Sequence, residues 1–70
     1  MNNKTLVHID DESKRIYSFE TDSVPQIGQY VRIKLGIMDD TYKIIDVTHN
    51  IVGDENYLAT SVILHVTKMQ

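Results

Sequence analysis

The chain has 70 residues, a net charge of −3 at neutral pH and no cysteine. That length fits one domain, spanning residues 1–70, whose small core gives modest stability. The lack of cysteine excludes disulfides as a source of that stability and fits a reducing compartment. The negative charge disfavours a broad basic surface for duplex nucleic acid.

The N-terminal residues lack the apolar stretch of a signal peptide, and apolar runs extend no further than three residues, as in 62–64. We therefore expect a cytoplasmic protein without a membrane-spanning segment.

Alternating β-branched and aromatic residues predict a hairpin at the start of the chain. Residues 5–9 form the first predicted strand, and residues 15–20 form the second, in which Tyr17 and Phe19 share a face. The polar residues 10–14 predict the turn between the two strands.

A connection over residues 21–29 leads to the next strand. Pro25 favours extended backbone in the residue before it, and Gly28 permits the positive φ of a turn. Residues 30–35 then show the clearest alternation in the chain, so we expect a strand with one apolar and one polar face.

Two longer strands complete the pattern. Residues 36–40 predict a tip, residues 41–52 a strand and residues 53–56 a second turn. Residues 57–69 also fit a helical spacing, but their β-branched residues favour a strand.

The fold class that this pattern predicts is all-β: a five-stranded antiparallel meander curled into a small SH3-like or OB-like barrel. Apolar residues that lie in phase within their strands predict the core. They are Val7, Ile9, Val31, Ile33, Ile45, Val47, Val62, Leu64 and Val66.

One stretch, VPQIGQYVRI followed by a short tip and YKIIDVTHN over residues 24–50, resembles small β-barrel proteins of phages and their bacterial hosts, many of them uncharacterised. The resemblance implies a mobile-element origin and a phage-encoded host-interaction or anti-defence role. It carries over no site residues.

No segment carries a catalytic, phosphate-binding or metal-binding motif. His8, His49 and His65 lie in predicted strands, but their spacing matches no metal signature. The sequence therefore predicts no catalytic residue, no metal ligand and no cofactor.

Acidic residues gather at the predicted turns. In an up-and-down meander the first and third turns lie at the same end, so their acids would form one rim that suits a basic protein surface. The residues of this candidate acidic rim are Asp10, Asp11, Glu12, Asp39 and Asp40. Acids that merely keep turns soluble would have the same pattern.

An alternative surface combines aromatic and basic side chains. Tyr30, Arg32 and Lys34 share one face of their predicted strand, and we expect Tyr42 to lie across from them on the next strand. OB-like barrels stack single-stranded bases on such a surface. The ordinary solvated face of a half-buried strand has the same composition.

The function that the sequence favours is a non-enzymatic binding module acting through protein–protein contact. Three alternatives remain open: an oligomer that binds a nucleotide-like small ligand, a single-stranded nucleic-acid binder, and a structural subunit of a virion or larger assembly.

The last predicted strand bears on self-association. Residues 57–67 are apolar on both faces and contain neither lysine nor proline. Because an apolar edge strand pairs with other chains, we expect this strand to be covered by the first strand or by its counterpart in a second copy. We expect a homo-oligomer with Ile63 in the interface.

Overall fold

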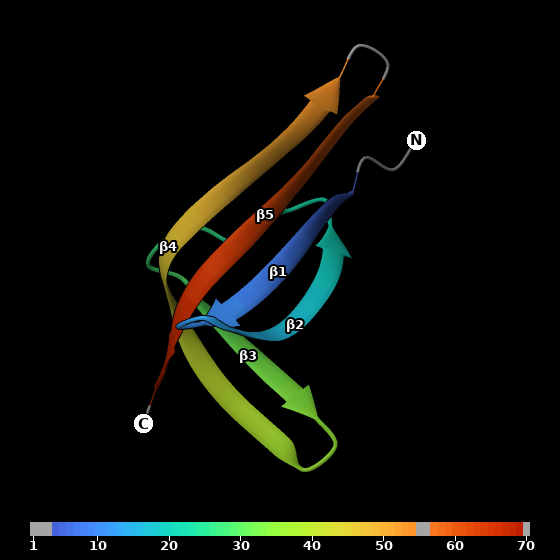
Figure 1. The fold of residues 1–70 in the computed structure, drawn as a ribbon. Coiled ribbons are helices and arrows are strands. Elements are labelled where there is room, and N and C mark those ends of the chain that lie inside the picture. The colour runs from blue at the N-terminus through green and yellow to red at the C-terminus, as the bar shows by residue number, and fades with distance from the viewer. Residues whose placement is uncertain (1–3, 55–56, 70) are drawn as a thin grey trace.

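The structure is a computed structural model that describes residues 4–54 and 57–69, with side chains described outside residues 54–59. The described chain is all-β and forms five strands (Figure 1). They are β1 (Thr5–Asp11), β2 (Lys14–Thr21), β3 (Tyr30–Leu35), β4 (Met38–Asp54) and β5 (Tyr57–Lys68). The strand predicted over residues 57–69 is confirmed against its helical alternative. None of the described segments forms a helix long and apolar enough to cross a membrane.

The predicted meander is wrong in its pairing. The strands form one mixed sheet in the order β2-β1-β5-β4-β3, in which β1 and β5 are parallel and the other pairs are antiparallel. After β2 the chain crosses to the opposite edge of the sheet before β3 begins, so β2 and β3 do not pair. The sheet therefore curls into an open half-barrel (Figure 1).

The apolar strand β5 lies at the centre of this sheet, between β1 and β4. Its residues 61–66 pair with β1. Of the two kinds of cover expected for this strand, the structure therefore has the one within the chain. The open edges of the sheet belong to β2 and β3 instead.

The core lies on one face of the curved sheet, here called the inner face; the opposite face is the outer face. Six of the nine predicted core residues are buried, and Val31 and Val47 are half-buried against them. The buried core comprises Val7, Ile9, Ile33, Tyr42, Ile44, Val62, Leu64 and Val66. Ile45, also predicted in the core, is 54% exposed.

A β-bulge explains the error at Ile45. In the β4–β5 ladder Ile44 pairs with Val66, whereas the next pair joins Asp46 to His65, so Ile45 has no partner. An extra residue in one strand reverses the alternation of side chains beyond it. Ile44 therefore faces inward before the bulge and Val47 faces inward after it.

Backbone hydrogen bonds join the connection between β2 and β3 to β4. Gly28 has a φ of +91° and donates its N–H to the Ile44 carbonyl oxygen at 2.9 Å. Ile44 in turn donates its N–H to the Gln29 carbonyl oxygen, also at 2.9 Å. The positive φ expected at Gly28 is thus confirmed, and it sets the point at which β3 joins the sheet.

Candidate functional site

A groove opens on the inner face between the two edge strands. Among the described residues, β2 and β3 have no Cα atoms within 8 Å of each other, whereas paired strands lie about 4.8 Å apart. The space between them is a groove of about 420 Å³, here called the seam groove. Its lining residues are Ile9, Tyr17, Phe19, Val31, Arg32, Ile33, Lys34 and Leu35.

The seam groove has an aromatic side and an aliphatic side. On β2, the rings of Tyr17 and Phe19 stack with centroids 6.2 Å apart and planes inclined by 23°. Both face inward because they pair with the buried residues of β1. On β3, alternation turns Val31, Ile33 and Leu35 inward. Tyr17 and Leu35 are 40% and 45% exposed, so part of this apolar surface meets solvent.

The backbone of β3 is open on the groove side. Ile44 bonds to Gln29, and in an antiparallel ladder hydrogen-bonded and non-bonded pairs alternate. Counting from Gln29, hydrogen-bonded pairs therefore recur at every second residue of β3. Tyr30, Arg32 and Lys34 are the residues between those pairs, so their N–H and C=O groups point away from β4.

Two cations border the seam groove on the outer face. The Arg32 guanidinium forms a two-pronged contact with Asp39: Nε donates to Oδ1 at 2.7 Å and Nη2 to Oδ2 at 2.6 Å. This hydrogen bonding lowers the pKa of the Asp39 carboxyl and raises the pKa of Arg32. Lys34 is exposed and forms no ion pair with any described residue.

The predicted aromatic-basic surface is assembled only in part. Tyr30, Arg32 and Lys34 share the outer face of β3, as expected from their alternation. Tyr42 does not lie across from them: it pairs with Val31, faces inward and is 5% exposed. The outer-face residue opposite Tyr30 is Lys43, which the sequence reading missed because that contact depends on the β3–β4 register.

The predicted acidic rim lies at one end of the sheet but not on one face. The β1–β2 turn and the β3–β4 tip do lie at the same end, since both border a second groove of about 550 Å³. Asp39 faces outward beside Arg32, whereas Asp40 faces inward, with its Oδ1 at 3.4 Å from Lys68 Nζ.

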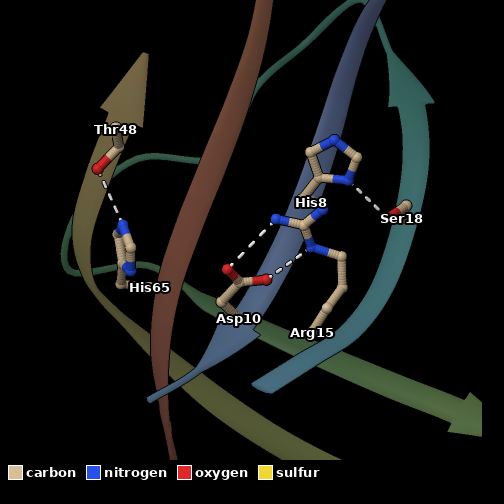
Figure 2. Close-up of polar contacts among 6 residues, drawn as sticks. All are labelled: His8, Asp10, Arg15, Ser18, Thr48 and His65. Atoms are coloured by element: carbon tan, nitrogen blue, oxygen red, sulfur yellow. Dashed lines mark hydrogen bonds and ion pairs between the residues drawn. The ribbon is translucent and has the colours of Figure 1, made fainter. Parts of the chain in front are cut away.

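A third acid of the rim is also paired. Asp10 Oδ1 accepts a hydrogen bond from Arg15 Nε at 2.9 Å on the outer face (Figure 2). That bond lowers the pKa of the Asp10 carboxyl. Among the described residues only Asp11 and Glu12 of the rim form no ion pair, so most of its negative charge is balanced within the chain.

The histidines do not converge. His8 Nδ1 lies 2.7 Å from Ser18 Oγ, directly across the β1–β2 ladder, and His65 Nε2 lies 2.9 Å from Thr48 Oγ1 (Figure 2). His49 pairs with Val62 and lies on the inner face. Within residues 4–54 and 57–69 no cluster of histidine and acidic residues is arranged to hold a metal ion.

Among the described residues, no third group forms a hydrogen bond to His8 beside the His8–Ser18 contact. An activated serine needs a histidine that a third group orients. The neighbouring carboxylate, Asp10, instead accepts hydrogen bonds from Nε and Nη2 of Arg15. The pair therefore serves as a cross-strand contact between β1 and β2.

Ile63 lies on the outer face of β5, half-buried between His8 of β1 and Thr48 of β4. Self-association through this residue stays a prediction. Comparison of the chain with protein-family models, with curated proteins and with solved structures found no match.

Proposed function

We propose that this chain is a non-enzymatic protein-binding module that accepts an extended segment of a partner as a sixth strand between β2 and β3. The observation that carries the proposal is the seam groove: an apolar groove flanked on each side by an edge strand that pairs with its sheet neighbour on the far side only. Main-chain hydrogen bonds to a sheet edge supply affinity in strand addition, and pockets for alternate side chains supply specificity.

The two edge strands are too far apart to pair with each other, as such an occupant requires. A strand inserted between two others separates them by two strand spacings, about 10 Å. The separation of more than 8 Å between Cα atoms of β2 and β3 is compatible with that distance. The added strand would complete a small barrel of the SH3-like or OB-like kind.

Strand direction limits how the segment pairs. The ladders make β3 parallel to β1 and antiparallel to β2. A segment between the two edges is therefore antiparallel to one and parallel to the other. Antiparallel pairing is slightly the more stable, and β3 offers its outward backbone groups without a bulge, so we infer antiparallel pairing with β3.

The test uses a displayed library of short random peptides, with the bound site mapped on the full chain by amide exchange. We expect selected peptides to slow exchange at the outward amides of Tyr30, Arg32 and Lys34. Leu35→Ser should weaken their binding, whereas Ile45→Ser, a matched change at an exposed apolar residue outside the groove, should not. Peptides that protect another surface, or a library that yields none, would contradict the proposal.

A further inference from the structure

We infer that the seam groove selects an extended segment in which apolar residues alternate with acidic residues. This inference rests on the proposed function and specifies the chemistry of the partner. Its basis is the different character of the two faces of β3, one apolar and the other cationic, both of which contribute residues to the groove lining.

Pleating fixes where the side chains of an added strand point. Residues of the segment that lie opposite Val31 and Ile33 share the inner face with them and enter the apolar groove. Residues opposite Arg32 and Lys34 share the outer face, with Cβ atoms about 5 Å from those of the two cations. One register therefore presents the segment with alternating apolar and cationic neighbours.

The charged residues that line the seam groove are opposite in sign to the net charge of the whole chain. Arg32 and Lys34 line the groove and no aspartate or glutamate is among its lining residues, although the chain carries a net charge of −3. Asp39, which binds Arg32, belongs to β4 and so lies on the closed side of β3.

The contact with Asp39 leaves donors on Arg32 for a partner. It uses Nε and Nη2, while a guanidinium carries five N–H donors in total. The Nη1 group is not used in that contact and can still donate to a carboxylate of a partner. Lys34 forms no ion pair within the described part of the chain and supplies a second position.

The same cations disfavour a second copy as the occupant. Pairing of β3 with β3 of another copy would place Arg32 and Lys34 of both edges on one face, and like charges directly opposite are destabilising. An acidic strand converts that repulsion into attraction. The cations thus discriminate among partners by sign of charge.

The test compares three fluorescent peptides of about eight residues, each alternating valine with glutamate, serine or lysine. Binding to the full chain is followed by anisotropy. We expect the glutamate peptide to bind about fivefold more tightly than the serine peptide, since two partly exposed ion pairs contribute modestly, and the lysine peptide to bind most weakly. Added salt should narrow these differences.

Substitutions test whether the preference for the glutamate peptide arises at the seam groove. Lys34→Gln should reduce the ratio between the affinity for the glutamate peptide and the affinity for the serine peptide. Lys43→Gln is the matched control, because Lys43 is an exposed cation on the same outer face that does not line the groove. Leu35→Ser should weaken binding of every peptide.

The outcomes separate this inference from the proposed function. Equal binding of the three peptides, still sensitive to Leu35→Ser, would overturn the charge preference and leave strand addition standing. Failure of all three to bind would overturn both. An oligothymidine that binds more tightly than the glutamate peptide and displaces it would assign the surface to single-stranded nucleic acid and overturn both as well.

Discussion

The three central strands and the two edge strands differ in how much of their backbone hydrogen-bonding capacity and apolar surface is satisfied within the chain. β1, β5 and β4 bond to neighbours on both sides along the half-barrel and supply residues such as Val7 and Leu64, which are fully buried. β2 and β3 bond on one side and carry Tyr17 and Leu35 at the edge of the core, partly in solvent. The core is thus complete without closure of the barrel, and the edge strands keep bonding capacity that the chain itself does not use.

The largest contrast expected between the two regions is in hydrogen exchange. Amides in the middle of β5 should exchange only through global unfolding, which costs about 5 kcal/mol for a domain of this size. The outward amides of Tyr30, Arg32 and Lys34 should exchange with opening free energies of about 0–1 kcal/mol, because nothing within the described chain accepts them. Exchange monitored by NMR measures both, and slow exchange at those three amides would mean that β3 is paired in solution.

A second prediction tests which residues of β4 belong to the core. Ile44→Ala should cost about 2–5 kcal/mol, because Ile44 is fully buried and its truncation leaves a cavity. Ile45→Ala should cost less than about 1 kcal/mol, since Ile45 is 54% exposed at the bulge. Denaturant unfolding measures both, with Leu64→Ala as a reference for a buried residue. Equal losses at Ile44 and Ile45 would contradict the bulge.

The alternation of apolar and polar residues was sufficient to predict the strands, but it did not predict for every residue which face of the sheet its side chain occupies. The strand over Tyr30–Leu35 has the predicted bounds, because its period of two is uninterrupted. In β4 the consecutive isoleucines Ile44 and Ile45 fit either phase, and the bulge that chooses between them depends on pairing with β5. The inward position of Tyr42 was missed for the same reason.

The seam groove was out of reach of sequence reasoning, because it depends on which strands become edges. Parallel pairing of β1 with β5 joins segments more than 50 residues apart (Leu6 with Ser61, for example), and no local signal records it. The cationic face of β3 could be predicted, because alternation alone places Arg32 and Lys34 together. Its relation to the groove could not.

A third prediction concerns the attachment of the edge strand β3. Gly28 has a φ of +91°, and a Cβ added there would meet nothing within 4 Å, so Gly28→Ala tests backbone strain alone. We expect a loss of about 1–2 kcal/mol, because residues with a side chain disfavour positive φ. Gly28→Asn should cost less, since asparagine tolerates this region better. If Gly28→Ala unfolds at the same denaturant concentration as the parent chain, the connection does not hold β3 in the way described.

The smallest effect is expected where the edge strand β2 meets the centre, at the Asp10–Arg15 ion pair. The hydrogen bond from Arg15 lowers the pKa of Asp10 in the folded chain, so Arg15→Gln should raise that pKa towards the ordinary aspartate value of about 3.9. A carboxyl whose pKa is lower in the folded state stabilises the fold above its unfolded pKa, and that contribution is lost as the pH falls through the folded pKa. Parent and variant should therefore differ in stability above about pH 4 and converge in more acidic solution.

Carboxyl titration by NMR measures this shift directly. Lys14→Gln is the control, because Lys14 precedes Arg15 on β2 but forms no ion pair with Asp10. An Asp10 pKa that rises in the Arg15 variant and stays unchanged in the Lys14 variant would locate the effect in the two-pronged contact. Equal shifts in both variants would instead assign it to the general positive charge of β2, and the edge would then be held to the centre by its backbone ladder and inward side chains alone.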